Sequence, residues 1–554
     1  MARTVGIGHQ NFEKLITSHN FYIDKTNFIK EWWEAGDDVT LLTRPRRFGK
    51  TLNMSMLEQF FSVKYAGYRD IFEGLSIWKE EKYRQMQGTW PVISISFAKV
   101  KAASFWNAKR MICQIITSLY NQYDFLLNSD KLNEKEKESF QKVSAEMEDY
   151  IAADSLNALS GYLMKYYGKR VLILLDEYDT PLQEAYVGGY WEQLVSFTRS
   201  LFNNTFETNP YMERAIMTGI TRVSRESMFS DLNNLKVVTT SSDAYVTCFG
   251  FTEEEVFSAM DEFGMDNRDE VKSWYDGFTF GSVTDIYNPW SITNMLDTGK
   301  LKTYWANTSS NSLAGSLIRQ GSQSIKMQFE RLLMGETITC VVDEEIVYGE
   351  LGQNAEAVWS LLLASGYLKS LDIQGDRYEL ALTNYETKKM FEKLVSGWFG
   401  SERSNYNDFI KALLLGDVKA MNAYMNRMTL AMFSSFDVGN RPSGRTEPER
   451  FYHGFVLGLL VELKDRYKVT SNRESGFGRY DVMLVPLQKE DDGIILEFKV
   501  HDSEDETDLK DTVKAALKQI DEKHYEQVLL DEGVEAERIR KYGFAFEGKQ
   551  VLIG

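Results

Sequence analysis

The stretch Arg44-Pro45-Arg46-Arg47-Phe48-Gly49-Lys50-Thr51 follows directly on Val39-Thr40-Leu41-Leu42, an apolar run typical of a buried strand. A loop that ends in Gly-Lys-Thr after such a strand is typical of a P-loop, in which main-chain N–H groups and a helix N-terminus surround phosphate. Lys50 would then reach the β- and γ-phosphates, and the Thr51 hydroxyl would bind Mg²⁺. The usual pattern has a glycine where this chain has Arg44, so the loop needs support from a second motif.

The second motif is Val171–Glu177, an apolar run of buried parallel-strand character that ends in two acids. Asp176 is predicted to hold Mg²⁺, mostly through water, and Glu177 to polarise the water that attacks the γ-phosphate. Taken separately, the two motifs read as a basic turn and as a strand that ends in solvated acids. Both together, in this order, predict a nucleotide-binding site.

The N-terminal half alternates strand-like and helical segments. Alternation of this kind predicts a parallel α/β sheet with helices on both faces. We expect an extra strand between the P-loop strand and the Asp176 strand, and we assign Pro91–Phe97 to that position. The strand-like segments are 39–43, 91–97, 171–176 and 215–220, and the helical stretches include 108–123 and 134–156.

Composition bounds the class of protein. The 554 residues predict about three domains, no apolar run approaches the ~20 residues needed to span a bilayer, and the N-terminus lacks a signal peptide. We therefore expect a cytoplasmic protein without membrane contacts.

The three cysteines form no CxxC pair, which argues against a zinc site or a disulfide framework. A net charge of −18 means that any nucleic-acid contact must come from a local patch.

A small helical lid is expected after the sheet. Thr252 and Glu255 have the spacing of a capping box, and Asn288-Pro289 is typical of an N-cap followed by proline at the first helical position. Trp274–Phe280 is interpreted as a strand pair about an Asp-Gly turn. These segments either are local structure alone or form a lid that closes over nucleotide.

Residues 301–432 are mostly helical, with a hairpin at Tyr367–Leu382, which suggests a winged-helix-like module. It lacks a Lys/Arg stripe, so a packing role is favoured over DNA binding.

Asp437–Glu449 has the composition of a linker, and the acidic run His501–Asp511 is interpreted as a solvated loop. The predicted domains are the P-loop domain 1–250, the lid 251–300, the connecting region 301–436, the linker 437–449 and a C-terminal α/β domain 450–554.

The C-terminal domain carries a second set of chemically informative residues. Side chains alternate along a strand, so Glu497 and Lys499 in Ile494–Val500 project to one face. If Asp481 on the neighbouring strand lies beside them, two carboxylates can hold a divalent ion, and Lys499 can orient water or stabilise charge on a phosphate. The pattern predicts metal-assisted phosphodiester hydrolysis. The alternative is that Glu497 and Lys499 simply pair at a sheet edge.

A helix downstream of these strands carries further polar residues. Gln519, Tyr525, Lys514 and Lys518 either line the same cleft or are ordinary helix-surface residues.

The N-terminal part resembles a known family through Phe21–Thr26 (FYIDKT), the RPRRFGKT loop, the LLDEYD strand, Trp274–Phe280 and Tyr287–Trp290. These motifs are similar to those of the AAA-ATPase-like family of bacterial proteins, related to STAND-type P-loop ATPases. That family's loop also lacks the first glycine. The resemblance implies ATP with Mg²⁺ as cofactor and Thr218 as a γ-phosphate sensor, with Arg222 close by. It also implies nucleotide binding by Arg46, Arg47, Phe48, Gly49, Lys50, Thr51 and Asp176.

The C-terminal part, through Tyr452-His453, Glu474–Asp481 and Glu497–Lys499, resembles the PD-(D/E)XK nuclease domain that commonly follows this ATPase. The resemblance implies Mg²⁺ or Mn²⁺ on Asp481 and Glu497, with Lys499 as the third catalytic residue. Glu449, His453 and Gln519 are candidate accessory residues.

These observations lead to a function hypothesis and its rivals. The first is an ATPase coupled to a metal-dependent nuclease, with DNA favoured over RNA and with nucleotide state controlling access to the nuclease site. The rival is an ATP-dependent switch or scaffold whose nuclease fold is inactive or serves for docking, which the acidic charge favours. A third reading, nucleotide sensing without turnover, is opposed by Asp176 and Glu177. A homo-oligomer is left open, with Arg222 and Arg225 as candidates to reach a neighbour's nucleotide.

Overall fold

The computed structural model divides the chain into two compact units. The first contains Met1–Gln320 and Gly335–Lys388, and the second contains Gly321–Met334 and Lys389–Gly554. Helix α16 (Tyr385–Trp398) begins in the first unit and continues into the second. The structure describes residues 3–207, 209–222, 229, 232–305, 312–320, 322–343, 351, 355–398, 403–433, 456–457, 459–460, 463, 466–471, 474–475, 478–479, 481–502, 506–547 and 550–554. Within these ranges, no helix is both long and apolar enough to cross a membrane.

A five-stranded parallel sheet forms the centre of the first unit, as the alternating pattern predicts. Its order is β2 (Val92–Ser96), β3 (Val171–Asp176), β4 (Met212–Gly219), β1 (Val39–Thr43) and β5 (Leu235–Val238). Every residue of β1 and β3 is buried, because helices cover both faces of a parallel sheet.

The strand between β1 and β3 differs from the expected one. Pro91–Phe97 was the predicted occupant, but β2 from that segment lies at the sheet edge beside β3. β4 takes the position between them, pairing with both β1 and β3. The prediction was wrong because chain order does not set strand order where long crossovers connect parallel strands.

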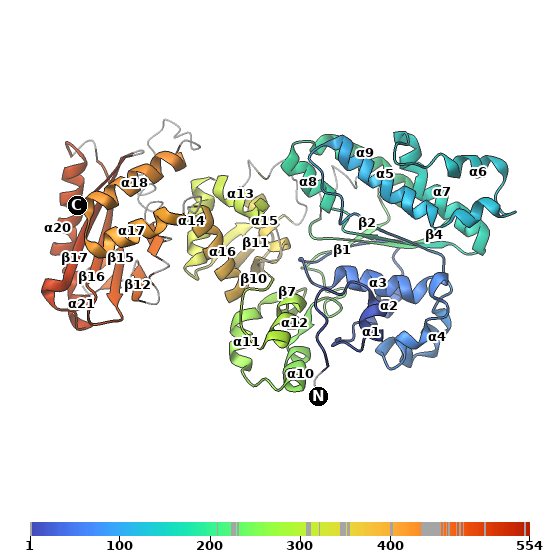
Figure 1. The fold of residues 1–554 in the computed structure, drawn as a ribbon, viewed down its shortest axis with the longest axis horizontal. Helices are drawn as coiled ribbons and strands as arrows, with labels where there is room; N and C mark the ends of the chain where they lie inside the picture. Colours follow the sequence, from blue (N-terminus) through green and yellow to red (C-terminus); the bar gives the residue numbers. More distant parts are fainter. Residues whose placement is uncertain are drawn as a thin grey trace. The chain divides into compact units, whose positions relative to one another are not determined.

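Helices pack on both faces of this sheet. α5, α7 and α9 lie on one side of it, and α2 and α3 lie on the other (Figure 1). The single helix expected over 134–156 is two helices, because Asn133 and Glu136 form a capping box for α6 and a new helix begins at Asp149. The helices are α1 (Phe12–Thr17), α2 (Asn27–Ala35), α3 (Lys50–Phe61), α4 (Glu81–Met86), α5 (Phe105–Asn121), α6 (Glu134–Gln141), α7 (Asp149–Tyr167), α8 (Thr180–Gly188) and α9 (Trp191–Phe206).

The predicted lid is a small helical layer on a three-stranded sheet. The capping box of Thr252 and Glu255 and the Asn288 N-cap are both confirmed. The hairpin about Asp276-Gly277 was wrong, because Tyr275 ends α11 and the strands turn after Phe280 instead. The elements are β6 (Phe251–Thr252), α10 (Glu253–Phe263), α11 (Arg268–Tyr275), β7 (Phe278–Phe280), β8 (Val283–Tyr287) and α12 (Pro289–Thr298).

The remainder of the first unit contains helices and a three-stranded sheet. The predicted hairpin is confirmed as β10 (Leu368–Gln374) and β11 (Arg377–Leu382), which turn at Gly375 with φ +67°. A third strand, β9 (Ile338–Val341), pairs with the other edge of β11. The helices are α13 (Ser312–Gln320) and α15 (Ala355–Ala364).

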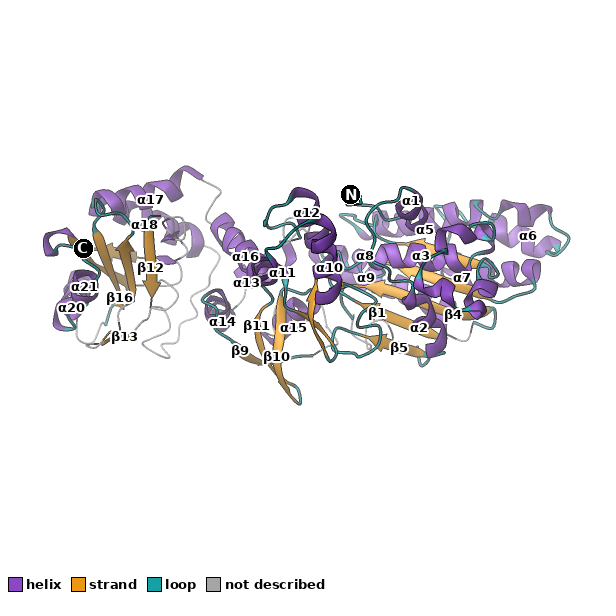
Figure 2. Ribbon diagram, turned by 90° about the horizontal axis from the view of Figure 1, so that it is seen from below, coloured by secondary structure: helices purple, strands orange, loops and turns teal. Residues whose placement is uncertain are grey.

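A mixed five-stranded sheet organises the second unit. α20 and α21 lie on one face, and α17 and α18 lie on the other (Figure 2). β16 pairs in parallel with β17, and the other neighbours are antiparallel. In order, the strands are β12 (Tyr467–Ser471), β15 (Val482–Pro486), β16 (Gly493–Val500), β17 (Ile539–Glu547) and β18 (Gln550–Ile553). The helices are α14 (Gln323–Leu333), α17 (Arg403–Leu415), α18 (Val418–Phe433), α20 (Leu509–Glu522) and α21 (Glu526–Asp531), and β13 (Glu474–Ser475) pairs with β14 (Gly478–Arg479).

α17 and α18 were assigned to the connecting region, but they share a hydrophobic core with the C-terminal sheet. Asn422 and Asn426 of α18 also bind the outer edge of β18. The Asn422 amide donates to Ile553 O at 2.8 Å and accepts from Ile553 N at 2.8 Å, and Asn426 pairs with Val551 in the same way at 2.6 and 3.0 Å. These amides take the place of a neighbouring strand and thereby cover a sheet edge.

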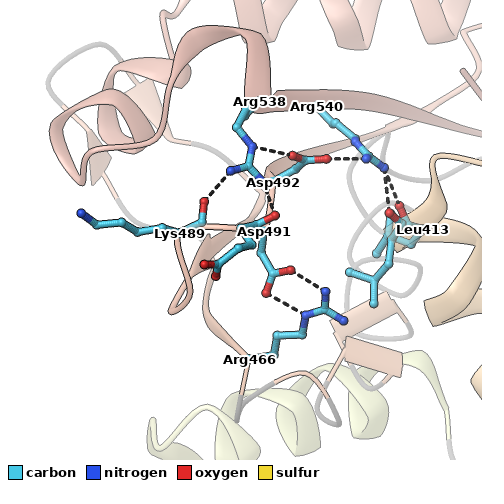
Figure 3. A network of polar contacts seen from close by, with 9 residues as sticks. Leu413, Arg466, Lys489, Asp491, Asp492, Arg538 and Arg540 are labelled. Carbon is cyan, nitrogen blue, oxygen red and sulfur yellow. Dashed lines mark hydrogen bonds and ion pairs between the residues drawn. The ribbon is translucent and has the colours of Figure 1, made fainter.

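An arginine and aspartate network closes the other end of the same sheet (Figure 3). Asp492, in the turn before β16, binds Arg538 and Arg540, and Arg540 also donates to Leu414 O at the end of α17 at 2.9 Å. Arg466 pairs with Asp491 of the same turn. The network fixes the β15–β16 turn against β17 and α17.

Candidate functional sites

The loop predicted to bind phosphate connects β1 to α3. Gly49 has φ +83° and N-caps α3, and Arg47 has φ +66°, so two positions of this loop adopt left-handed backbone. A cavity of about 470 Å³ adjoins the loop, lined among others by Lys50, Thr51 and Glu177. The structure therefore places the predicted phosphate ligands in one cavity at a helix N-terminus.

Lys50 is buried, and its ammonium group donates to the loop's own carbonyls, Arg44 O at 2.8 Å and Pro45 O at 2.9 Å. Burial lowers the pKa of Lys50, since desolvation disfavours the charged form. These acceptors are neutral, so an anionic phosphate oxygen would bind the same ammonium more strongly.

Asp176 brings Thr51 and Thr218 together at the carboxyl end of the sheet. Its carboxylate accepts from Thr51 Oγ1 at 2.8 Å and from Thr218 Oγ1 at 2.5 Å. Burial raises the pKa of Asp176, although both hydroxyls oppose this shift. Three side chains that are far apart in the sequence thus meet because β1, β3 and β4 are adjacent parallel strands.

Glu177 adopts a left-handed backbone with φ +52°, which is uncommon for a residue other than glycine. Its side chain accepts from Thr180 Oγ1 at 2.7 Å, and its N–H points to Thr218 Oγ1 at 3.4 Å. The carboxylate lines the cavity that Lys50 also lines.

Arg44 occupies the position at which the usual phosphate-loop pattern has a glycine, and its side chain is not part of the cavity lining. Its guanidinium is fully buried and donates to Thr43 O at 2.9 Å, Thr239 O at 2.6 Å and Ala244 O at 3.1 Å. It also lies 4.6 Å from the Phe280 ring centroid. Burial lowers the pKa of Arg44 to about 10, so the group stays charged at neutral pH. Arg44 therefore supports the loop from the side of the protein core.

Asp179 is a buried carboxylate that the motif analysis did not assign. It accepts from Ile220 N at 2.9 Å and Thr221 N at 3.0 Å, which fixes the chain after β4. Gln183 donates to Asp179 at 3.0 Å and accepts from Arg46 at 3.1 Å. The only sequence signal was the second Asp of LLDEYD.

Two residues from distant parts of the first unit hold the Arg46 carbonyl. Asn288 Nδ2 donates to it at 3.3 Å and Trp305 Nε1 at 3.1 Å. The Trp305 N–H in turn donates to Glu386 Oε1 at 2.7 Å, and Ser291 Oγ donates to Glu386 Oε2 at 2.7 Å. Glu386, in the first turn of α16, is thereby connected to the phosphate loop.

The aromatic residues of the lid also contact this loop. The Arg47 guanidinium lies 4.4 Å from the Trp290 ring centroid, and Phe48 packs edge-on against Phe278 at 4.8 Å. Pro289 and Trp290 therefore line the cavity of the predicted nucleotide site, whereas the Phe-Thr-Phe motif contacts the loop through Phe48.

The FYIDKT motif positions the lid. Lys25 is buried and donates to both carboxylate oxygens of Glu255 at 2.7 Å and to Thr247 O at 2.8 Å. Asp24 accepts from Thr26 and Ser76. The motif joins the start of α10 to the N-terminal segment.

In the second unit, Asp481 and Glu497 lie opposite each other. Val482 pairs with Leu496, so the register continues to Asp481 and Glu497. The Asp481 carboxylate accepts from Phe498 N at 2.8 Å. Glu497 is 2% exposed, and both acids lie on the sheet face covered by α20.

Gln519 of α20 joins the predicted catalytic pair. Its amide oxygen accepts from Lys499 Nζ at 2.7 Å, and its amide nitrogen donates to Glu497 Oε1. The same nitrogen lies 3.4 Å from the Tyr525 hydroxyl. Burial raises the pKa of Tyr525, and the charges of Glu497 and Asp481 raise it further. Gln519 of α20 and Tyr525, the N-cap residue of α21, therefore lie beside Glu497, as the cleft-lining interpretation predicts.

The other predicted residues lie outside this cluster. Lys514 and Lys518 are exposed and pair with acids on their own helix. Arg222 follows β4 and is partly exposed. Glu449, His453 and Arg225 lie outside the described residues.

Both sites contain oxygen ligands suited to Mg²⁺. Within the described ranges, no three His, Cys, Asp or Glu side chains gather into one metal-binding group. Mg²⁺ usually keeps several waters and needs only one or two carboxylates. Asp176 with Thr51, and Asp481 with Glu497, therefore fit such an ion.

Family comparisons agree with these two sites. Residues 6–229 match the model of the predicted AAA-ATPase family, and residues 447–554 match the PD-(D/E)XK nuclease superfamily. The chain thus carries an AAA-ATPase-like domain followed by a C-terminal PD-(D/E)XK nuclease-superfamily domain. A protein of Azotobacter chroococcum mcd 1, described as an uncharacterized protein in vnfD 5'region, is 25% identical over 479 residues, which cover 83% of this chain and 84% of that protein.

Proposed function

We propose that the protein hydrolyses ATP and couples nucleotide state to a divalent-metal-dependent nuclease that cuts DNA. The observation that carries the proposal is the Gln519 amide, which joins Glu497 to Lys499 on the strand beside Asp481. Such an arrangement suits a reaction site, because a structural pair of Glu497 and Lys499 needs no third group to hold both.

Each residue of the proposed ATPase site has a separate role. Lys50 neutralises the β- and γ-phosphates, and Thr51 and Asp176 hold Mg²⁺, which would screen phosphate charge. Glu177 orients and polarises the attacking water, and Thr218 contacts the γ-phosphate while sharing a hydrogen bond with Asp176. Arg46, Arg47, Phe48 and Gly49 complete the phosphate loop.

The nuclease site divides the work in a similar way. Asp481 and Glu497 hold Mg²⁺ or Mn²⁺, which would stabilise charge on the phosphate. Lys499 orients the attacking water or stabilises the developing negative charge. Gln519 binds both Lys499 and Glu497, so these two side chains do not pair directly with each other. Lys499 can then bind water or phosphate, and Glu497 can bind the metal ion. Glu449 and His453 stay proposed accessory residues.

Glu386 supports coupling between the two activities. It is 1% exposed and connects to the Arg46 carbonyl through Trp305, and to the lid through Ser291. It stands in the first turn of α16, the helix that continues into the second unit. A change in the phosphate loop therefore has a short, buried path to this helix.

The test is cleavage of single- and double-stranded DNA and RNA with Mg²⁺ or Mn²⁺, with and without ATP. We expect wild type to cut DNA, Asp481→Ala to lose cutting, and Lys50→Ala to lose the ATP response. The matched controls are Asp531→Ala and Lys64→Ala, which replace exposed residues of the same types. Absence of both ATP turnover and cleavage in wild type would sink the proposal.

A switch or scaffold is the second candidate. The net charge of −18 favours it, because such a surface repels nucleic acid. Calorimetry of Mn²⁺ binding separates the two: an active nuclease loses metal binding in Asp481→Ala, whereas a docking module shows no difference between this variant and wild type.

A further inference from the structure

His501 directly follows β16 and lies in line with the proposed nuclease residues. Its N–H donates to Phe546 O at 2.9 Å, so the extended chain continues through it. Side chains alternate along an extended chain, which places Glu497, Lys499 and His501 on one face. The His501 side chain is only 7% exposed, so the predicted solvated loop does not include this residue, whereas Thr507 and Asp508 of the same run are exposed.

The imidazole is held from one side. Nδ1 lies 3.1 Å from Thr512 Oγ1 and 3.3 Å from Glu506 Oε2. The Thr512 hydroxyl gives its hydrogen to Glu506 Oε2 at 2.5 Å, so its lone pair accepts the hydrogen of Nδ1. In the part of the chain that the structure describes, Nε2 has no hydrogen-bond partner. The ring is oriented through Nδ1, and Nε2 is left for another group.

The negative charge of the Glu506 carboxylate is stabilised by neighbouring hydrogen-bond donors. Its Oε2 accepts from the Thr512 hydroxyl and from Asp502 N at 3.0 Å, and it lies 3.3 Å from the imidazole Nδ1. An anion that approaches Nε2 therefore meets a carboxylate that is already compensated. An imidazole that carries hydrogen on both nitrogens can donate to Thr512 through Nδ1 and to an anion through Nε2.

Helix α20 places this histidine in the same row as the catalytic groups. Thr512 and Gln519 are seven residues apart, which puts them on one helix face two turns apart. Gln519 binds Lys499 and Glu497, and Thr512 binds His501. Lys499 and His501 are about 7 Å apart along the strand, a length comparable with the separation of successive phosphates in an extended nucleic-acid strand.

We propose that His501 binds the nucleic-acid phosphate next to the one that is cut, through Nε2–H, with Thr512 and Glu506 as positioning residues. The inference rests on the proposed nuclease function and adds a phosphate subsite to it. Direct cleavage of the bond stays with Asp481, Glu497 and Lys499.

The test uses the full chain with Asp481→Asn as the parent, so that nucleic acid is bound but not cut. Anisotropy of fluorescein-labelled single-stranded DNA is titrated over a series of salt concentrations. His501→Gln is expected to weaken binding about tenfold and to reduce the slope of log affinity against log salt by roughly one, as for the loss of one phosphate contact. Lys489→Gln, at the opposite end of β16, is the matched control and leaves both unchanged.

Kinetics on the otherwise wild-type protein provide a second readout. His501→Gln is expected to raise KM for DNA with kcat within about twofold, the pattern of lost ground-state binding. Glu506→Gln keeps the ring hydrogen-bonded but removes the compensating charge, so it is expected to weaken binding about threefold. It also serves as the test if His501→Gln does not fold.

Each outcome has a distinct meaning. Unchanged affinity and salt slope in a folded His501→Gln, or a fall in kcat alone, overturns the subsite and leaves the nuclease intact. If wild type and the Asp481→Asn parent bind neither DNA nor RNA, the proposed function falls together with this inference.

Discussion

Asp176 is a carboxylate whose proposed role as a Mg²⁺ ligand conflicts with its buried surroundings. It is 4% exposed at the end of a wholly buried strand, and burial raises its pKa. We expect Asp176→Asn to abolish ATP hydrolysis and to raise the thermal midpoint of the nucleotide-free protein by about 2–4 °C, the shift that ~1 kcal/mol produces in a domain of this size. Calorimetric scans of both proteins check this.

The pH dependence follows from the direction of the shift. The folded protein holds the Asp176 proton more tightly than the unfolded chain does. Its contribution to stability is therefore complete below the ordinary carboxyl pKa and is lost as pH rises through the raised pKa. The advantage of Asp176→Asn should grow across this window, and an advantage independent of pH would contradict the assignment.

Gln519 tests the nuclease site at the level of one side chain. Gln519→Ala removes the group that holds Lys499 and Glu497, so we expect kcat for cleavage to fall about 10–100-fold, comparable with loss of a partner that orients a metal ligand. The Mn²⁺ concentration for half-maximal cleavage should rise as well. Lys518→Gln, the exposed neighbour, is the control. A loss of activity without a change in metal dependence would indicate a structural role only.

At the scale of an element, Gly543 determines how closely α20 approaches the sheet. It pairs in parallel with Glu497, and a Cβ there would lie 2.8 Å from Val513 O of α20. Gly543→Ala must displace this backbone, at a cost of about 1–3 kcal/mol. We expect lower stability of the second unit, measured by denaturant unfolding, and slower cleavage because Gln519 moves with the helix. Normal cleavage by this variant would show that the helix position is not limiting.

The pairing of α18 with β18 is a second element-scale feature. Asn422→Ala leaves the main-chain donor and acceptor of Ile553 without partners, and each unsatisfied buried group costs about 1–3 kcal/mol. We expect the unfolding free energy to fall by that order, and Asn426→Ala to behave alike. Lys419→Ala, on an exposed position of α18, controls for helix propensity. Equal stability of all three variants would contradict the edge-covering role.

For the whole molecule, the prediction concerns coupling. Glu386→Gln removes the carboxylate charge and leaves one accepting oxygen, so the Ser291 hydroxyl must turn from donor to acceptor while Trp305 N keeps its acceptor. We expect ATP to be hydrolysed at close to the wild-type rate. The factor by which ATP changes DNA affinity, about 5–150-fold for typical coupling energies, should fall toward one. DNA titrations with and without ATP measure it.

The control for coupling is Glu392→Gln, which lies on the same helix in an ion pair with Lys389. It should leave the ATP effect on DNA affinity unchanged. If Glu386→Gln couples like wild type, the path through Trp305 and Ser291 does not transmit the nucleotide state.

Local sequence patterns predicted much of the fold and of the two candidate sites. Glycine and lysine before a helix, acids at the end of an apolar strand and the capping box of Thr252 are short-range signals, and the parallel α/β sheet followed from them. Lys499 and Glu497 were also assigned to one strand face from alternation alone. These features depend on residues a few positions apart, which the sequence states directly.

Tertiary structure decided the rest, because long-range contacts leave no local pattern. Pairing placed β4, and not β2, beside the phosphate-loop strand, and packing assigned α17 and α18 to the C-terminal sheet. His501 and Glu386 look like ordinary polar residues in the chain, and Gln519 was predicted only as a candidate accessory residue. Only the folded protein gives them their partners, since a buried polar group must be satisfied by whatever the fold brings within reach.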